Sequence, residues 1–258
     1  MLEKELLKKK LKIYCSVAIS GVFQNLKNRC PIDLFCNYWV IGILGLSLTA
    51  CCLYGAGGTD SRGHFAAPPS TKVSGKPLIV IDPGHGGSDI GAEVKSVQEK
   101  VLAVKTGTLV KQYLQRKGYR VILTRSRDVS VSLTKRTAIA NHTKSKVFVS
   151  IHYNAFKNPQ AKGIEVYYYN RGSKWRRNAS KKLARLVLDR MIASTGAKNR
   201  GVKTANFHVI RETNMAAILI EGGFITNPHE RSDLSDQKYV EKLALSIAAG
   251  IENYLKNC

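Results

Sequence analysis

From residue 76 to the C-terminus, short apolar runs rich in β-branched residues alternate with longer segments whose apolar residues recur every three or four positions. The short runs are typical of strands buried on both faces, and the longer segments are typical of amphipathic helices. The expected strands are Leu78–Asp82, Tyr119–Thr124, Lys146–Ile151, Gly163–Tyr169, Phe207–Arg211 and Ala216–Ile220. The expected helices are Gln98–Lys117, Ser132–Thr143, Ser173–Ser194 and Gln237–Lys256. This alternation predicts an α/β fold in which helices cover both faces of a mostly parallel sheet.

The helix expected at residues 173–194 has a strongly basic composition. Its basic residues are Lys174, Arg176, Arg177, Lys181, Lys182, Arg185 and Arg190, and Asp189 is its one acidic residue. Its apolar stripe is Trp175, Ala179, Leu183, Leu186 and Val187, which predicts that the basic side chains face solvent. Two interpretations stay open for this face, an ordinary solvated surface and a surface that binds an anionic polymer.

The first 75 residues differ from the rest of the chain. Trp39–Ala50 is an apolar run that is too short to span a bilayer and fits the hydrophobic region of a secretory signal. Leu48–Cys51 resembles the lipobox of bacterial lipoproteins, in which the cysteine is acylated and becomes the new amino terminus. The sequence therefore predicts a signal segment at 1–50, a lipid anchor at Cys51, a flexible linker at 51–75 and a folded domain at 76–258. A short signal anchor with incidental cysteines is the alternative.

The chain carries 41 lysine and arginine residues against 18 acidic residues, a formal net charge of +23 at pH 7. This excess favours anionic partners such as nucleic acid, an acidic cell-wall polymer or a lipid surface. No zinc finger, aromatic RNA-binding signature or basic heptad region accompanies it, so no nucleic-acid partner is expected. All six cysteines lie outside residues 53–257, so the expected folded region uses neither disulfides nor thiolate zinc sites.

Four residues able to bind a metal or transfer a proton lie close to the ends of expected strands. His85 follows the first strand in I-D-P-G-H-G-G, and Glu99 lies in the first turn of the helix that comes after it. His152 directly follows the third strand, and Glu221 directly follows the last one. Because open α/β sheets bind ligands at the carboxyl ends of their strands, these four side chains are expected to converge there.

The four residues suit a catalytic zinc site. Two neutral imidazoles and one carboxylate commonly hold catalytic Zn²⁺ and leave a fourth position for water. His85, Glu99 and His152 are therefore the predicted zinc ligands, and Glu221 is the predicted base that accepts a proton from the water. Burial at the end of an apolar strand is expected to raise the pKa of Glu221. The remaining histidines lack this placement and are interpreted as surface or incidental residues: His64, His142, His208 and His229.

Five motifs in order carry a resemblance to a known family. They are I-D-P-G-H-G-G-S-D-I-G-A, Q-E-K around Glu99, L-T-R at 123–125, S-I-H-Y-N-A and I-E-G-G-F-I-T-N. From Leu78 to about Leu255, the chain resembles the zinc-dependent N-acetylmuramoyl-L-alanine amidases of the amidase 3 family. The resemblance implies a six-stranded, mostly parallel sheet between helices. It also implies His85, Glu99 and His152 as zinc ligands, Glu221 as the catalytic glutamate, and hydrolysis of the amide between N-acetylmuramic acid and L-alanine of the stem peptide.

Residues 76–258 are thus expected to form one zinc amidase domain that acts on peptidoglycan as a monomer, in cell-wall remodelling or daughter-cell separation. Only 68 residues separate His152 from Glu221, which leaves no room for the helix that blocks the site in some relatives, so no activator is expected. The alternatives are a zinc peptidase that cuts within the stem peptide and an inactive wall-binding lipoprotein. The anchor at Cys51 predicts a periplasmic or cell-envelope location, and Cys52, which stands where some lipoproteins have aspartate, favours the outer membrane.

Overall fold

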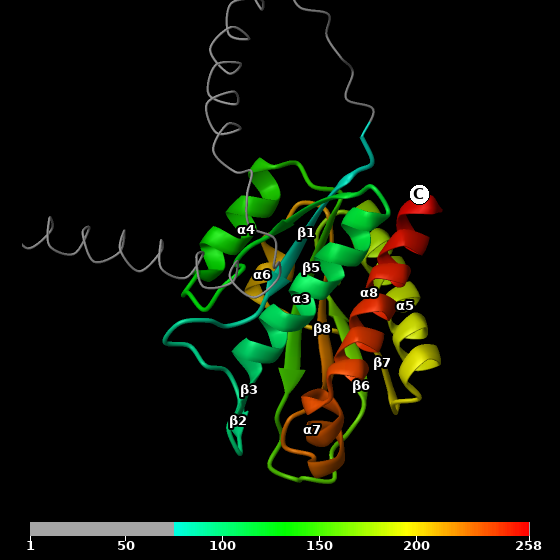
Figure 1. The fold of residues 1–258 in the computed structure, drawn as a ribbon. Helices are drawn as coiled ribbons and strands as arrows, with labels where there is room; N and C mark the ends of the chain where they lie inside the picture. Colours follow the sequence, from blue (N-terminus) through cyan, green and yellow to red (C-terminus); the bar gives the residue numbers. More distant parts are fainter. Residues whose placement is uncertain (1–74, 258) are drawn as a thin grey trace, which may run out of the picture. The chain divides into compact units, whose positions relative to one another are not determined.

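The computed structural model describes residues 75–257, so the predicted signal segment, the lipobox at Cys51 and the linker up to residue 74 lie outside the described residues (Figure 1). The centre of the described fold is a six-stranded sheet in the order β4-β1-β5-β8-β6-β7. Its strands are β1 (Leu78–Pro83), β4 (Arg120–Leu123), β5 (Val147–Asn154), β6 (Ile164–Tyr168), β7 (Asn199–Thr204) and β8 (Ala216–Phe224). Neighbouring strands are parallel except β6 and β8, which are antiparallel. The predicted six-stranded, mostly parallel sheet is confirmed.

Helices cover both faces of this sheet (Figure 1). One face carries α3 (Glu99–Arg116), α5 (Lys174–Thr195) and α8 (Gln237–Lys256), and the other carries α4 (Leu133–His142) and α6 (His208–Arg211). Two small elements complete the described chain. They are the hairpin of β2 (Glu93–Val94) and β3 (Val97–Gln98), and the helix α7 (Pro228–Ser235) between β8 and α8.

The central strands are buried on both faces, as their apolar runs predict. In β1, Ile79 and Ile81 pack in the core beneath α3, α5 and α8, whereas Val80 packs in the core beneath α4 and α6. Successive side chains of a strand point to opposite faces, so one continuous apolar run supplies both cores. All three side chains are fully buried, and each contributes roughly 1.5–3 kcal/mol of hydrophobic stabilisation.

The prediction of a strand at residues 207–211 is wrong. His208–Arg211 forms α6, and the sixth strand is β7, Asn199–Thr204. A short apolar run does not distinguish a strand from a helical turn. β7 lies at the edge of the sheet and is only partly buried, so it lacks the apolar run of a central strand. The sequence reasoning also misses α7, although the Asn227 side chain caps its first turn and Pro228 occupies its first position.

The apolar stripe predicted for α5 is wrong at Trp175, which is 64% exposed. The buried side of the helix begins only at Ser180 and continues through Leu183, Ala184, Val187, Leu188 and Met191. The indole therefore lies on the outer surface with Lys174, Lys181, Lys182, Arg185 and Arg190, which are exposed as predicted. The prediction is wrong for Arg176, which is half-buried because its guanidinium donates to the carbonyl oxygens of Ile210 and Arg211 in α6.

The carboxyl ends of β1, β5 and β8 lie together, because these strands are adjacent and parallel. His152 of β5 lies in register with Glu221 of β8. After β1 the chain turns back through the β2–β3 hairpin, and the Glu99 backbone N–H that begins α3 donates to the Ala92 carbonyl oxygen. The fold thus brings the ends of three strands and the start of one helix to a single edge. Within residues 75–257, none of the helices combines the length and the apolar character that crossing a membrane requires.

Candidate metal centre and active site

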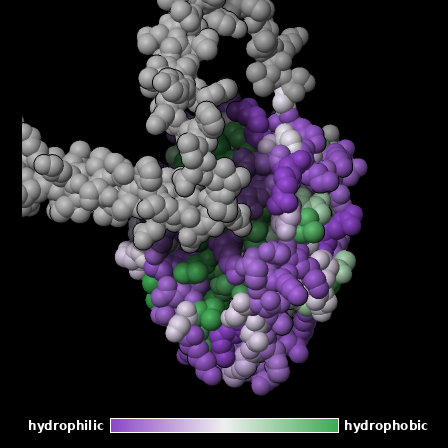
Figure 2. Space-filling model, in the orientation of Figure 1, coloured by the Kyte–Doolittle hydropathy of each residue, from purple (hydrophilic) through white to green (hydrophobic). Residues whose placement is uncertain are grey.

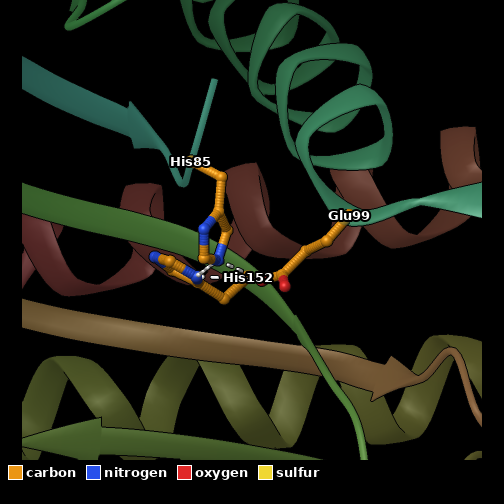
Figure 3. A group of neighbouring side chains, drawn as sticks. All are labelled: His85, Glu99 and His152. Carbon is orange, nitrogen blue, oxygen red and sulfur yellow. Dashed lines mark hydrogen bonds and ion pairs between the residues drawn. The ribbon is translucent and has the colours of Figure 1, made fainter. Parts of the chain in front are cut away.

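His85, Glu99 and His152 converge at the carboxyl edge of the sheet, as predicted (Figure 3). The distance from Glu99 Oε1 to His85 Nε2 is 3.0 Å, and that to His152 Nδ1 is 2.9 Å. The two imidazole nitrogens are 3.2 Å apart. Three donor atoms from three separate elements therefore form a nearly equilateral triangle.

This triangle fits a zinc ion. Ligand bonds of about 2.0–2.1 Å in tetrahedral geometry place the ligand atoms about 3.3 Å from one another, close to the separations of the three donors. Two imidazoles and one carboxylate also leave a tetrahedral ion one open position. The imidazoles reach solvent, since the His85 and His152 side chains are 22% and 18% exposed, whereas the Glu99 side chain is only 7% exposed.

Neighbouring groups hold the three side chains in place. His85 Nδ1 lies 2.9 Å from Asp89 Oδ1, so an N–H on Nδ1 donates to the carboxylate and leaves Nε2 free for a metal. The Glu99 carboxylate accepts hydrogen bonds from the backbone N–H groups of Tyr153, at 3.1 Å, and Ala92, at 3.0 Å. Burial alone would raise the pKa of Glu99, but the His152 and His85 imidazoles beside its Oε1 atom hold the pKa far below its usual range in the metal-free protein. The carboxylate is therefore ionised, as a metal ligand must be.

A buried ion pair supports the loop that carries His85. Asp82, at the end of β1, accepts hydrogen bonds from Thr124 Oγ1 at 2.6 Å, Ser150 Oγ at 2.8 Å and Arg136 Nη1 at 2.7 Å. The Arg136 guanidinium also donates to the carbonyl oxygen of His85 at 2.7 Å. Every residue of this network is buried except His85, so the network holds the loop backbone from the side of the protein interior.

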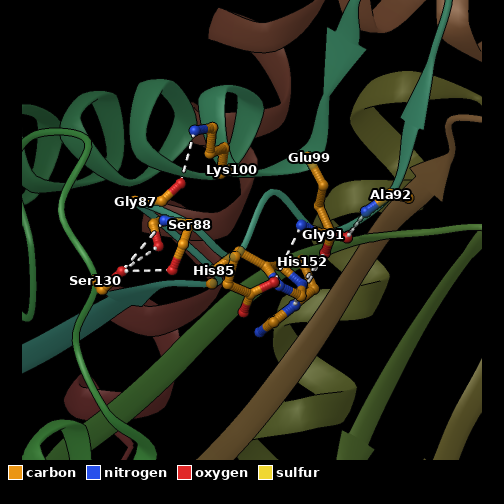
Figure 4. A network of polar contacts seen from close by, with 12 residues as sticks. His85, Gly87, Ser88, Gly91, Ala92, Glu99, Lys100, Ser130 and His152 are labelled. Carbon is orange, nitrogen blue, oxygen red and sulfur yellow. Dashed lines mark hydrogen bonds and ion pairs between the residues drawn. The ribbon is translucent and has the colours of Figure 1, made fainter.

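A second polar network fixes the loop from outside (Figure 4). Ser130 Oγ donates to the Gly86 carbonyl oxygen at 3.1 Å, and the Gly87 N–H donates to Asp128 Oδ1 at 2.7 Å. Lys100, one residue after Glu99 in α3, bridges the Gly87 carbonyl oxygen and Asp128. The two networks together position the imidazole before any metal binds.

Close packing requires glycine on both sides of His85. A Cβ atom on Gly84 would lie 2.3–2.6 Å from atoms of the His152 ring. Gly86 has φ +126° and an added Cβ would lie 2.5 Å from the Val129 carbonyl oxygen. His85 itself has φ 56°, a left-handed conformation that is uncommon for a residue with a side chain. Such strain persists only where surrounding contacts hold it, which the two polar networks do.

Glu221 lies half-buried beside this centre, and its Oε2 atom is buried. Its Oε2 atom accepts no hydrogen bond from the described residues. Burial, followed by the negative charges of Glu99 and Glu165, raises the pKa of Glu221 well above its usual value. A buried carboxyl oxygen without a protein partner is costly, and it marks a place where a water or substrate group binds.

A buried glutamate lies next to Glu221 on the neighbouring strand. Glu165 of β6 and Glu221 of β8 are paired in antiparallel register. Glu165 accepts hydrogen bonds from Lys203 at 2.5 Å, Arg200 at 2.8 Å, and Tyr167 at 2.8 Å. Burial opposes ionisation of Glu165, but these donors lower its pKa. The two neighbouring carboxyl groups therefore have pKa values shifted in opposite directions.

A cavity of about 320 Å³ opens beside the two histidines. Phe207 and His208 from the start of α6 and Leu133 from the start of α4 form part of its wall, together with His85 and His152. His208, interpreted from the sequence as a surface or incidental residue, thus lies at the site. The sequence analysis missed this position because it placed His208 in a strand at residues 207–211, whereas the residue begins the helix α6. His142 and His229 are exposed, as predicted.

Fold and site together define an α/β protein with a His–Glu–His cluster suited to a divalent metal at the carboxyl edge of a parallel sheet. Residues 79–253 match the amidase 3 family of N-acetylmuramoyl-L-alanine amidases. The chain belongs to this family, which confirms the resemblance carried by its five motifs.

Individual relatives agree with this assignment. N-acetylmuramoyl-L-alanine amidase AmiC of Neisseria meningitidis serogroup B is 30% identical over 275 residues, covering 89% of this chain and 66% of that protein. CwlM of Bacillus licheniformis is 36% identical over 175 residues, covering 67% of this chain and 66% of that protein. A crystal structure of an N-acetylmuramoyl-L-alanine amidase from Clostridium difficile 630 superposes with a TM-score of 0.67 at 38% identity, covering 71% of this chain and 98% of that one. The chain spans just under two thirds of the length of the curated relatives it matches first.

Proposed function

We propose that this protein hydrolyses the amide bond between N-acetylmuramic acid and L-alanine of the peptidoglycan stem peptide. The family assignment supports the substrate and the bond. The observation that carries the chemistry is the placement of Glu221, whose buried Oε2 atom has no partner among the described residues, next to a His–Glu–His triangle of donor atoms. His85, Glu99 and His152 are the proposed ligands of Zn²⁺, and Glu221 is the proposed general base.

Each residue has a distinct task in this proposal. A zinc ion, when bound, supplies an acidified water and a positive charge that polarises the scissile carbonyl. Glu221 accepts the proton of the attacking water and then delivers it to the departing alanine nitrogen. Its raised pKa suits both steps, because a base whose pKa lies nearer to the working pH is also an acid able to return the proton. The cavity walls formed by Phe207 and Leu133 would hold the substrate and exclude water from the reacting bond.

The decisive experiment combines metal analysis with digestion of purified muropeptides. The unit Lys72–Cys258 contains the whole described sheet and its core, so it is expected to fold without the preceding segment. We expect one zinc per chain and release of intact stem peptides that begin with alanine, identified by mass spectrometry. Products cut inside the stem peptide would instead indicate a peptidase, and wall binding without turnover would indicate an inactive wall-binding protein.

We further propose that the full chain is a monomeric cell-envelope lipoprotein acylated at Cys51, with sorting to the outer membrane. Support comes from the lipobox and the apolar run before it. Incorporation of a labelled fatty acid by the wild type, and its loss together with membrane association in Cys51→Ala, would be the expected outcome. The short segment between His152 and Glu221 supports a further proposal, that the purified domain needs no activator. A domain that is inactive until a partner protein is added would contradict it.

A further inference from the structure

A surface hollow lies at the opposite end of the domain from the candidate active site. Its volume is about 780 Å³, and its walls come from the start of β1, the first turns of α5 and the end of α8. Figure 1 shows the start of β1 and the C-terminal end of α8 at one end of the domain, and the β2–β3 hairpin and α7 at the other. α5 starts at the hollow because β6, which precedes it, is antiparallel to β8 and therefore ends away from Glu221.

The hollow has a basic and aromatic rim. Lys146 and Lys182 line it with Trp175, and no acidic residue does. A second hollow of about 340 Å³ continues along α5, shares Lys182, and is lined by Lys181 and Arg185, with Asp189 at its far side. In the part of the chain that the structure describes, Lys146, Lys181, Lys182 and Arg185 form no ion pair. We call the surface formed by Trp175, Lys146, Lys181, Lys182 and Arg185 the α5 face.

What sets the α5 face apart is the combination of its two features. Its indole is 64% exposed and lies at a hollow rimmed by cations that have no ion-pair partner among the described residues, so the surface is both apolar and positively charged. An indole surrounded by lysine and arginine is the composition of protein surfaces that lie in the interfacial region of a membrane with anionic lipids. Figure 2 shows that the side of the domain carrying α8 is mainly hydrophilic, with small apolar areas among the polar ones, so no broad apolar surface competes with the α5 face on that side.

We propose that the α5 face binds anionic phospholipid headgroups and orients the enzyme on its membrane. This proposal rests on the proposed lipid anchor. Gly75, which lines the hollow, is about two dozen residues after Cys51, so an extended chain could separate them by at most about 80 Å. An anchor at Cys51 would therefore limit how far the α5 face can move from the bilayer and raise the effective concentration of lipid headgroups around it. Docking there would direct His85 and His152 away from the membrane, toward the cell wall.

The test uses the fluorescence of Trp175. The chain has two tryptophans, Trp39 and Trp175, so the Lys72–Cys258 fragment contains Trp175 alone and lacks the predicted anchor. Phosphatidylcholine vesicles with or without about one third phosphatidylglycerol are added at about 0.15 M salt. We expect co-sedimentation and a blue shift of the emission only with the anionic vesicles, and quenching by brominated lipids. Co-sedimentation without a change in emission would show that another surface docks and would overturn the proposal, as would failure to bind.

Matched variants separate the α5 face from net charge. In the first variant Trp175→Ala is combined with glutamine at Lys181, Lys182 and Arg185. In the control, Phe156→Ala is combined with glutamine at Lys95, Lys135 and Lys157, an equal loss of charge and of one exposed aromatic ring elsewhere on the surface.

We expect the first variant to bind anionic vesicles at least tenfold more weakly than wild type and the control to change less than threefold. An equal loss of vesicle binding in both variants would show that the α5 face is not the docking surface. Stronger binding of soluble polyglycerol phosphate than of vesicles would instead identify a wall polymer as its ligand. Turnover of soluble muropeptides, measured in parallel, is expected to be unchanged in the first variant, whose substitutions lie at the end of the domain away from His85 and His152, so failure of this proposal is distinct from failure of the proposed activity.

Discussion

Replacing Glu221 by glutamine separates the stability cost of this carboxyl group from its proposed role as a base. Glutamine has nearly the same shape but carries no charge and cannot accept the proton of a water. Loss of a general base typically lowers the rate by 10²–10⁴-fold, a loss of about 3–5 kcal/mol of transition-state stabilisation. The zinc content should stay at the wild-type value, since Glu221 is not among the three proposed ligands.

The same substitution that lowers the rate is expected to raise the stability of the folded protein. The folded-state pKa of Glu221 is raised, so the protonated group contributes stability that is fully present below the unfolded pKa, near 4.3, and is lost as the pH rises through the folded pKa. Each pH unit between the two pKa values removes about 1.4 kcal/mol. Glutamine does not titrate, so metal-free Glu221→Gln should gain stability relative to wild type as the pH rises from 4 to 8.

Glu165→Gln is the matched control, because the same substitution is made on the neighbouring strand. The folded-state pKa of Glu165 is lowered, so its stabilising contribution is present above the unfolded pKa and is lost as the pH falls through the folded pKa. Glutamine there leaves Arg200 and Lys203 without their carboxylate. Both cations are partly exposed and can return to water, so we expect a loss of about 2 kcal/mol at neutral pH.

Urea unfolding of the metal-free proteins across pH 4–8 measures both effects, and muropeptide turnover measures the rate. The two variants should diverge in stability as the pH rises. If Glu221→Gln keeps more than about one tenth of wild-type turnover, the base assignment is wrong. If its stability relative to wild type does not change with pH, the buried carboxyl group is not responsible for the pH dependence.

Three further substitutions test the contacts that hold the candidate metal ligands in place. Gly84→Ala should lower muropeptide turnover at least tenfold, because the added methyl group displaces the His152 ring, and unchanged turnover would contradict this. Arg136→Met should lower the free energy of unfolding by about 3–5 kcal/mol, since it leaves the buried Asp82 carboxylate without its cation, and a loss under 1 kcal/mol in urea would contradict this. Asp89→Ala should weaken zinc binding about 10–100-fold in competition with a chelator, and unchanged affinity would show that the tautomer needs no partner.

The sequence alone was enough to predict which residues meet at the carboxyl edge of the sheet. The apolar runs that become β1, β5 and β8 are continuous because those strands are buried on both faces, so the positions of the strands are readable. Their expected ends are wrong for β5 and β8, which continue to Asn154 and Phe224 and therefore contain His152 and Glu221. Adjacent parallel strands end at one edge, and this places His85, Glu99 and His152 together without any knowledge of their distances.

Tertiary structure alone decided the walls of the site and the charge state of its glutamates. Strand β7 is an edge strand without an apolar run, so the sequence gives no sign that Arg200 and Lys203 reach the Glu165 carboxylate or that the next turn brings His208 to the cavity. Glu165 and Glu221 are chemically identical and both follow apolar residues. Their pKa values differ in direction because one carboxylate meets two cations and the other meets none, and only the pairing of distant strands determines which partners a buried group receives.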